Sequence, residues 1–412
     1  MKLSIICYLS DDKKLNQTTV EALEKMASYS LEHDNQVTVA GKHVDKKYNN
    51  GKKDSVTASY EVEIILNTDR VRDDRSWYEN VITRIGNHAF TSKVNKETYV
   101  SEQDAHQKMA EKASGDYIMI IHAGDDISSN LAEVFVKGNV QCYDMDTYMI
   151  TKAFHDETFG AFRNYKKVTD GEDIKSFYII DLKSKYDCFP FGFGGVIIRA
   201  EAFKKQSVDP ALGLEAERDF MLRLMAKAMK TCFLPYATLT AYEYEEHDNT
   251  FYRGLYMREW YFESITDFWM PFLQEMKVTY GSIPVFIQYN FMYSVMARFN
   301  GNMDNKNKHV IEEGHGEEYL ELIGQALRLI EENIMLNRNK VVDCITGDTM
   351  KWVYGILRNG KAYKFERFFL AGKIYYGIGD TLFNSLMSLS TNILFINYRD
   401  GMLEIDGTVH PI

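Results

Sequence analysis

The sequence has little proline and no long hydrophobic run. Six prolines among 412 residues are too few for long disordered linkers, and no stretch reaches the roughly 20 consecutive apolar residues of a membrane-spanning helix. The apolar run near the start, KLSIICYLS, is too short for a signal peptide. Hydrophobic residues nevertheless make up 45% of the chain, and aromatic residues 13%. We therefore expect a globular protein of two or three domains, cytoplasmic or at most peripheral at the inner face of the cell membrane.

Cysteine is also scarce, and positive charge is in deficit. The five cysteines have no CxxC spacing, which argues against a disulfide framework and a zinc site and favours a reducing cytosol; they are Cys7, Cys142, Cys188, Cys232 and Cys344. A formal charge of −11 argues against nonspecific nucleic-acid binding, because neutralising phosphates needs clustered lysine and arginine. Any phosphate that this protein handles is expected to arrive with a metal ion.

Strands and helices alternate in the first part of the chain. The patterns predict a strand at 2–10, a helix at 18–32, a strand at 60–69, a helix at 101–115 and a strand at 117–121. Thr18 and Glu21 suit a capping box for the first helix, whereas Ser101 caps the second helix and Gly115 stops it. This alternation predicts an α/β fold with a parallel, doubly wound sheet, whose ligand crevice lies at the carboxyl ends of the strands.

Two adjacent carboxylates, Asp125 and Asp126, follow the third predicted strand in YIMIIHAGDD. A turn rich in glycine and aspartate is an ordinary way to leave a strand and to cap the next helix. Paired carboxylates at the carboxyl end of a buried strand also favour a divalent cation, through hard oxygen ligands. The local sequence leaves both interpretations open.

The pattern changes after residue 136. Further strands are predicted at 146–154, 158–168 and 231–244. Between them, Gly192, Gly194 and Gly195 lie beside aromatic residues in FPFGFGGVII. Glycines in such a place allow either a β-bulge or a close approach of the backbone to a ligand.

Helical periodicity dominates from residue 254. One core-facing helix is predicted at 319–334, with an apolar stripe made of Tyr319, Ile323, Ala326, Leu327, Ile330 and Ile334. The basic, aromatic stretch 350–373 suits a solvated helix face or an anionic membrane surface, and 391–412 predicts two short strands around residues 399–401. The predicted domains are 1–254, a helical extension at 255–375, and a β segment at 376–412 that begins a further domain of a longer polypeptide.

Three motifs follow one another in the first 255 residues: AHQKMAEKASGDYIMIIHAGDD, AERDFMLRL and YEYEEHDNTF. They resemble the segments ARNxGxxxAxGEYIxFLDxDD, EDxDxxLRL and YYxRxHxNSxS of family 2 glycosyltransferases, which have the GT-A fold. The stretch 282–300 is similar to the helical extension of bacterial members that build capsular or teichoic-acid-like polymers. The resemblance implies a Rossmann-like, mostly parallel sheet and a nucleotide-sugar substrate.

The chain departs from the resembled pattern at the metal motif. Aligned without gaps, His122 and Gly124 stand at the first and central aspartates of that motif, and only Asp125 is retained. A shift by one residue instead places Asp125 and Asp126 on its last two aspartates. The resemblance implies that one of these carboxylates holds Mn²⁺ or Mg²⁺, with His247 as a further ligand or as a contact to the diphosphate. Such an ion would act as a Lewis acid on the leaving diphosphate.

The predicted contacts to the donor nucleotide come from strand ends, from one helix and from glycines. They are Tyr8, Asn67, Asp69, His106, Gln107, Gly124, Gly194 and Gly195. Tyr8 replaces the proline of the family's first strand, and Asn67 and Asp69 lie in LNTDR, which replaces the family's VDDGS. His106 and Gln107 stand at the family's RN positions, where contacts to the nucleotide or the pyrophosphate are implied.

The catalytic base is predicted at the start of the helix that AERDFMLRL opens. Glu217 stands where the resemblance places an aspartate as base, and Asp219 keeps the next acidic position. A carboxylate at a helix N-terminus is also what the helix dipole favours without any chemistry. Direct attack by the activated hydroxyl would invert the configuration at the anomeric carbon.

The sequence therefore predicts an inverting, metal-dependent glycosyltransferase. The donor is a nucleotide diphosphate sugar, expected to be a UDP-sugar. The acceptor is a hydroxyl of a bacterial surface polysaccharide, of a polyol-phosphate (teichoic-acid-like) polymer or of a lipid-linked glycan precursor. One alternative is a catalytically degenerate binding or scaffold module, which the altered HAGDD and LNTDR motifs favour. A second is a metal-dependent nucleotidyltransferase, against which CYLSDDKKL argues because it lacks a glycine-rich phosphate loop.

Overall fold

The chain forms two compact units, Met1–Arg253 and Gly254–Ile412, in a computed structural model. The structure describes residues 1–40, 55–68, 71, 75–86, 90–95, 97–142, 145–156, 177–184, 190, 192–243, 254–303, 310–311, 314–336, 348–361, 366–370, 373–378, 381–385, 390–399 and 402–410. Of the predicted site residues, Asp69 and His247 lie outside these ranges, as does the predicted strand at 158–168.

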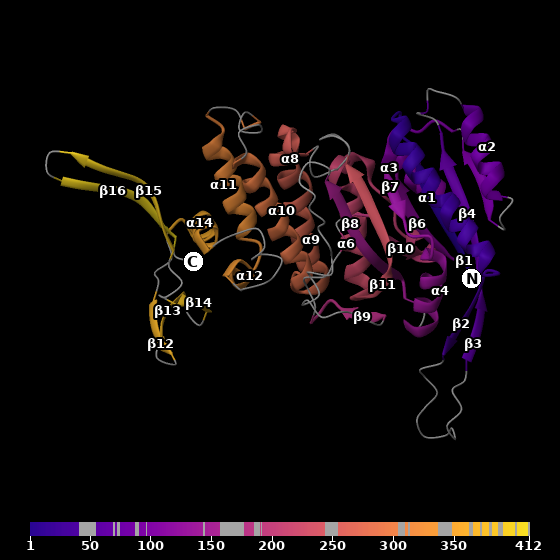
Figure 1. Cartoon of the computed structure of the whole chain (residues 1–412). Helices are drawn as coiled ribbons and strands as arrows, with labels where there is room; N and C mark the ends of the chain where they lie inside the picture. Colours follow the sequence, from indigo (N-terminus) through magenta and orange to yellow (C-terminus); the bar gives the residue numbers. More distant parts are fainter. Residues whose placement is uncertain are drawn as a thin grey trace, which may run out of the picture. The chain divides into compact units, whose positions relative to one another are not determined.

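A nine-stranded sheet forms the centre of the first unit (Figure 1). Its main path runs β5 (Thr91–Asn95), β4 (Glu61–Asn67), β1 (Lys2–Tyr8), β6 (Tyr117–His122), β10 (Val196–Arg199), β8 (Thr147–Asp156), β11 (Lys230–Glu243) and β7 (Asp125–Ile127), and β9 (Tyr178–Asp181) also pairs with β11. Strands β10, β7 and β9 run antiparallel to the other strands. The predicted α/β class with a mostly parallel sheet is confirmed. A separate hairpin of β2 (Gln36–Ala40) and β3 (Ser55–Ser59) was not predicted.

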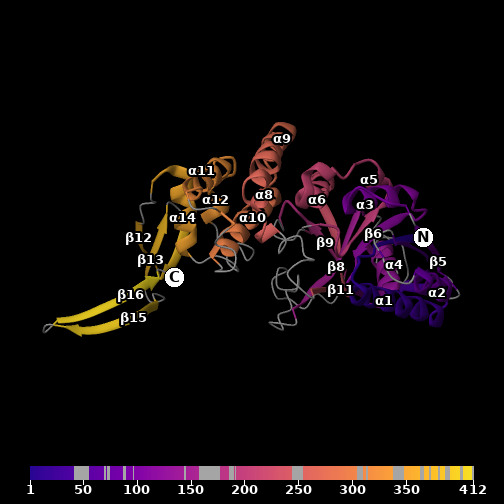
Figure 2. The same ribbon diagram turned by 90° about the horizontal axis from the view of Figure 1, so that it is seen from above.

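Helices cover both faces of this sheet, as the view from above shows (Figure 2). The helices on one face are α1 (Lys13–Glu32), α2 (Arg75–Gly86) and α4 (Leu131–Cys142), and those on the other are α3 (Glu102–Lys112), α5 (Ala200–Lys204) and α6 (Ala216–Ala228). A 3₁₀ helix, η2 (Pro210–Glu215), leads directly into α6. This layered arrangement follows from strands that are apolar on both faces.

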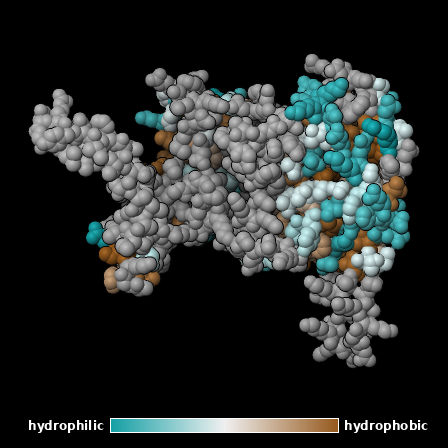
Figure 3. All heavy atoms as spheres, in the orientation of Figure 1, coloured by the Kyte–Doolittle hydropathy of each residue, from teal (hydrophilic) through white to brown (hydrophobic). Residues whose placement is uncertain are grey.

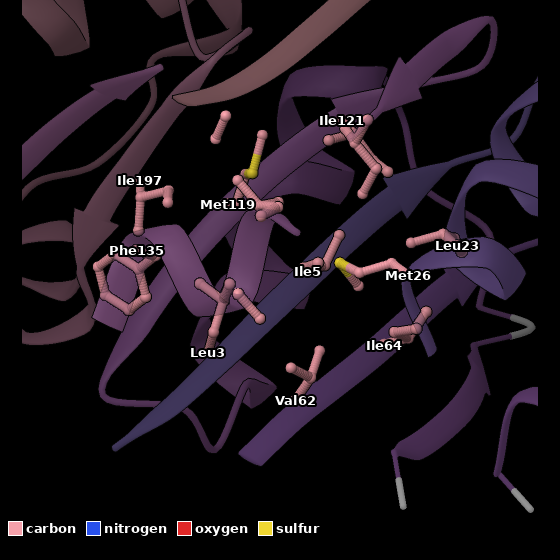
Figure 4. Close-up of a cluster of buried hydrophobic side chains, with 14 of the residues drawn as sticks. Leu3, Ile5, Leu23, Met26, Val62, Ile64, Met119, Ile121, Phe135 and Ile197 are labelled. Atoms are coloured by element: carbon pink, nitrogen blue, oxygen red, sulfur yellow. The ribbon is translucent and has the colours of Figure 1, made fainter. Parts of the chain in front are cut away.

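The alternation of side chains along each strand divides the interior into two layers. Alternate residues of β1, β4 and β6 enter one continuous core beneath α1 and α4. The close-up shows Leu3, Ile5, Val62 and Ile64 packed beside Met26 of α1 (Figure 4). The intervening residues of the same strands face α3. Among them are the last residues of the three strands, which the candidate site uses.

Two predicted helix ends differ from the structure. Helix α1 begins at Lys13, because the side chain of Asp12 accepts hydrogen bonds from Lys14 N and Leu15 N; Thr18 instead donates to the carbonyl of Lys14 within the helix. Ser101 caps α3 as predicted, by accepting from the backbone of the third helical residue. This helix ends at Lys112, before Gly115. The glycine serves a strand contact, since an added Cβ would lie 2.6 Å from Ser4 Oγ.

The surface that α1 presents is mainly hydrophilic, with small hydrophobic patches between polar residues (Figure 3). This pattern matches the buried residues of the helix, which lie along one side only. Among the helices that the structure describes, none combines the length and the apolar character needed to traverse a lipid bilayer.

The second unit is helical and then β-rich. Its helices are α8 (Arg258–Tyr261), the π-helix η3 (Ser264–Trp269), α9 (Met270–Tyr280), α10 (Val285–Met303), α11 (Gly316–Leu327), α12 (Glu332–Leu336) and α14 (Asp348–Asn359). Strands β12 (Glu366–Leu370), β13 (Lys373–Ile378) and β14 (Thr381–Ser385) form one antiparallel sheet, and β15 (Ser390–Arg399) and β16 (Met402–His410) form a hairpin. The β segment thus starts ahead of residue 376, the first residue of the predicted β segment.

The single helix predicted at 319–334 is two helices, α11 and α12. Its apolar stripe is buried as predicted, but the helical hydrogen bonds stop between the two segments. Gln288 explains the break, because its side-chain oxygen accepts from Glu331 N at 2.7 Å. A side chain from α10 therefore replaces a carbonyl within the helix as the partner of that amide.

Candidate active site

The carboxyl ends of the parallel strands form one row of polar residues. Tyr8 pairs with Asn67 on one side and with His122 on the other, and Asn67 pairs with Asn95. Tyr8 and Asn67 are buried. In open α/β sheets this edge is where ligands bind, so the row is the expected position of a ligand site.

Helix α3 crosses this row and adds Glu102 and His106, which are one helical turn apart on the same side. The imidazole of His106 is completely buried. It lies edge-on to Tyr8, His122 and Phe193, with ring centroids 6.1, 5.3 and 6.0 Å away. Glu102 Oε1 lies 3.9 Å from His106 Nε2.

Glu217 reaches the same point from the first turn of α6. Its Oε2 accepts a hydrogen bond from Phe193 N at 3.2 Å, and its Oε1 lies 3.3 Å from His106 Nδ1 and 3.5 Å from His122 Nε2. The backbone of Gly192 comes close to this carboxylate, since an added Cβ would stand 2.8 Å from Glu217 Oε2. A larger residue at this glycine of the FPFGFGG stretch would push the carboxylate of the predicted base aside.

His122 links the cluster to the carboxylate of Asp125. Its Nε2 lies 3.6 Å from Glu102 Oε1, and its Nδ1 lies 3.7 Å from Asp125 Oδ2. The same Asp125 oxygen accepts the backbone N–H of His122 at 2.8 Å. Asp125 is almost fully buried, and its two contacts to His122 tie β7 to the end of β6.

The acidic and histidine side chains of the cluster stabilise each other's charged forms. Burial alone would raise the pKa of Glu217, but His106 and His122 together hold it well below its ordinary value. Burial alone would lower the pKa of His122, but Asp125, Glu217 and Glu102 hold it well above its ordinary value. Beneath them, burial and the charges of Asp125 and Glu102 raise the pKa of the Cys7 thiol, which stays neutral.

The structure thus brings together five of the predicted residues: Tyr8, Asn67, His106, Asp125 and Glu217. It adds two that sequence reasoning did not assign, Glu102 and His122. The sequence contained part of the signal. Glu102 and His106 are four residues apart and so share one helix face, and the strand that follows this helix ends in His122. What the sequence does not contain is the distance between that helix face and the strand end.

Several predicted residues have other partners. Asp126 points to the opposite side of β7 from Asp125, and the nearby charges that act on it are Lys25 and Glu21 of α1. Burial is the main cause that raises its pKa. Asp219 accepts from Arg223 Nε at 2.8 Å within α6. Because Asp125 and Asp126 point to opposite sides of β7, they do not form one joint carboxylate pair.

Gln107 and the predicted glycines make contacts within the protein. Gln107 accepts from Val208 N at 3.1 Å, which anchors the segment before η2. Gly124 N donates to Thr19 Oγ1 and has a φ of 93°, and Gly195 has a φ of 79°. Gly194 precedes it and is partly exposed. The positive φ values explain two of these glycines by conformation, because other residues rarely adopt them.

The donor set of the cluster fits a divalent cation. Glu102, His106 and His122 each offer one ligand atom, and these atoms lie within 4.8 Å of one another. Within the described part of the chain, neither ring nitrogen of the buried His106 has a hydrogen-bond partner, although carboxylates lie close to both. Buried polar atoms usually have a partner, and a bound ion is one kind of partner that would satisfy this imidazole.

Comparisons with known proteins bear on the fold. No family model matches the chain, and no curated protein matches its sequence. Among solved structures, S. aureus TarS 1-349 in complex with UDP-GlcNAc matches with a TM-score of 0.51 and 11% identity, over 93% of this chain and 99% of that one. The longer S. aureus TarS structure gives the same score and identity, over 97% of this chain.

The chain has the GT-A-like fold of TarS. It spans 62% of the length of the longer TarS structure. At 11% identity, this likeness concerns the fold and not the reaction. The predicted GT-A fold is confirmed, and the row of strand ends with its His and Glu residues lies where such a sheet places its ligand crevice.

Proposed function

We propose that this protein is an inverting glycosyltransferase that uses a nucleotide diphosphate sugar, most simply a UDP-sugar. Its acceptor would be a hydroxyl of a bacterial surface polysaccharide, a teichoic-acid-like polymer or a lipid-linked glycan precursor. The observation that carries the proposal is the convergence of Glu217, His106 and His122 at the carboxyl ends of β1 and β6. The GT-A-like fold supports it.

The strand ends would receive the nucleotide. Tyr8 offers an aromatic ring and Asn67 an amide, side by side on neighbouring strands. These groups suit stacking and hydrogen bonding to a base. Asp69, two residues beyond β4, is a further candidate in this proposal.

Glu217 would act as the base. Its lowered pKa keeps it ionised at neutral pH, and the bond from Phe193 N to Oε2 leaves Oε1 directed into the cluster. As the acceptor hydroxyl attacks the anomeric carbon, Oε1 would take its proton while the nucleotide diphosphate leaves from the opposite side. A positioned base typically contributes ~10²–10⁴-fold to the rate.

A divalent ion, Mn²⁺ or Mg²⁺ in the proposal from sequence, would supply charge neutralisation for the leaving diphosphate. Glu102, His106 and His122 are the residues that would hold it. Asp125 would keep His122 in place through the backbone bond and the facing ring nitrogen.

The test combines binding with turnover in one variant. Glu217→Gln should bind UDP as the unmodified protein does once Mn²⁺ is saturating, but should lose ~10²–10⁴-fold in metal-dependent hydrolysis of radiolabelled nucleotide sugars, which many transferases perform without acceptor. Glu201→Gln is the matched control, because the Glu201 side chain is largely exposed on α5 and pairs with the equally exposed Lys205. Near-normal turnover in Glu217→Gln would show that Glu217 is not the base and that Asp219 or another residue has this role.

One observation favours a second function, a degenerate binding or scaffold module. Gly124 stands at the central aspartate of the resembled motif, and His122 and Glu217 already stabilise each other's charged forms without an added ion. Nucleotide binding without hydrolysis of any sugar nucleotide, in the unmodified protein, would support the scaffold function and contradict the transferase.

A further inference from the structure

We propose that Glu102, His106 and His122 form a transition-metal site that prefers ions with high affinity for imidazole, such as Zn²⁺ and Co²⁺, over Mg²⁺. Glu217 and Asp125 are the positioning residues that fix the two imidazoles. This metal site refines the proposed function. It rests on that function only for the role of the ion in sugar transfer. Metal binding itself is independent of nucleotide and sugar.

The three donor atoms are nearly close enough to share one ion. Glu102 Oε1 lies 3.9 Å from His106 Nε2 and 3.6 Å from His122 Nε2. Ligands bonded at about 2.1 Å to one tetrahedral ion stand about 3.4 Å apart. Small rotations of these side chains would therefore complete the site.

His106 provides an independent reason to expect a ligand. Its ring is completely buried between Tyr8, His122 and Phe193, and neither of its nitrogens makes a hydrogen bond with the described residues. Burying a polar group without a partner is unfavourable. An ion on Nε2, with a proton on Nδ1 directed at Glu217, would satisfy both nitrogens at once.

The two imidazoles share one arrangement. Glu217 Oε1 faces Nδ1 of His106 at 3.3 Å, and Asp125 Oδ2 faces Nδ1 of His122 at 3.7 Å. In both rings the other nitrogen, Nε2, faces Glu102. A carboxylate that accepts the second N–H of a metal-binding histidine fixes the tautomer and raises the basicity of the ligand. In both rings a carboxylate oxygen therefore stands near Nδ1, and a small movement would bring it into this relation.

The donor types decide which ion is favoured. Mg²⁺ prefers six oxygens, several of them from water, whereas imidazole nitrogen suits Zn²⁺, Co²⁺ and related ions. Two of the three donors here are nitrogens. The site also differs from the carboxylate pair predicted from sequence, because Asp126 faces α1 and not the cluster.

The test uses the full chain without an affinity tag, stripped of metal by a chelator and then titrated with Co²⁺, Zn²⁺, Mn²⁺ and Mg²⁺ by calorimetry. We expect one Co²⁺ per chain, with the visible absorption of a low-coordinate site, affinities in the order Mn²⁺ < Co²⁺ < Zn²⁺, and no displacement by excess Mg²⁺. His122→Gln and Glu102→Gln should each weaken Co²⁺ binding by at least ~10-fold. Both side chains are partly exposed, so these variants are expected to fold.

The controls separate this site from adventitious metal binding elsewhere on the chain. His33→Gln removes an exposed histidine of the same unit and should leave the Co²⁺ affinity unchanged. Glu217→Gln should lower the affinity ~10–100-fold while one ion per chain still binds. If Asp126→Asn abolishes binding whereas His122→Gln does not, or if Mg²⁺ binds as tightly as Co²⁺, the proposal is wrong. Tight Co²⁺ binding without any sugar transfer would contradict the proposed function alone.

Discussion

Replacing the buried Glu63 by glutamine should loosen the parallel half of the sheet in a way that depends on pH. Glu63 lies on β4 and is fully buried. Its Oε2 accepts from Ser4 Oγ at 2.6 Å and from Ser114 N at 2.8 Å, and its Oε1 accepts from Lys93 Nζ at 2.6 Å. One carboxylate thus connects β4 to β1, to β5 and to the entry of β6. The strand register that aligns the site depends on these neighbours.

The magnitude follows from the pKa of this carboxyl. Burial alone would raise the pKa, but the bonds from Lys93, Ser4 and Ser114 lower it from 4.5 to about 2. Because the pKa of Glu63 is lower in the folded state, the ionised carboxyl stabilises the fold fully above pH 4.5. This stabilisation is lost as the pH falls from 4.5 toward 2. The full effect is roughly 3 kcal/mol, of which about 2 kcal/mol is lost between pH 7 and pH 3.

Glutamine resembles the protonated carboxyl, so the difference between the two proteins should shrink in acid. Hydrogen exchange of peptides from β1 and β4 should be about 10²-fold faster in Glu63→Gln at pH 7, but only about 5-fold faster at pH 3. Comparing both proteins at the same pH cancels the intrinsic exchange rates. Glu61→Gln, an exposed change on the same strand, is the control. An exchange ratio that stays constant from pH 7 to pH 3 would refute the reasoning.

Two further substitutions test the site and the helix cap. Gly192→Ala places a Cβ where it would lie 2.8 Å from Glu217 Oε2, and moving a reacting group by about 1 Å costs ~10²-fold in rate. Nucleotide-sugar hydrolysis should therefore fall by about that factor. The affinity for UDP, measured by calorimetry, should be unchanged. An equal loss of affinity would show that the glycine serves binding instead. Asp12→Ala should cost about 1 kcal/mol of unfolding free energy in urea, whereas Thr18→Ala should cost much less; the reverse order would place the cap at Thr18.

Strands β1, β4 and β6 of the first unit were predictable because their signal is local. The apolar runs at β1, β4 and β6, and the serine that caps α3, are read from adjacent residues. The start of α1 was not predictable in this way, because Asp12 and Thr18 both satisfy the local rules for a cap. The choice is made by tertiary packing, which buries Leu15 ahead of the predicted start.

The carboxylate pair was misplaced for a nonlocal reason. Asp125 and Asp126 were expected in a turn, but they form β7 with Ile127 and pair with Leu239–Ala241 of β11. Successive residues of a strand point to opposite faces, so the pair is divided between the cluster and α1. The pairing partner lies too far along the chain for any local pattern to reveal it.

The charges of the cluster connect metal binding to donor binding. Three carboxylates, those of Glu102, Asp125 and Glu217, surround two imidazoles. With the proton that the raised pKa keeps on His122, the group still carries excess negative charge. A diphosphate would be repelled there, since like charges in a partly buried site interact strongly. A dication in place of that proton adds one further positive charge next to the leaving group. If the metal proposal holds, UDP should bind weakly to the metal-free protein, and the donor and the ion should bind cooperatively.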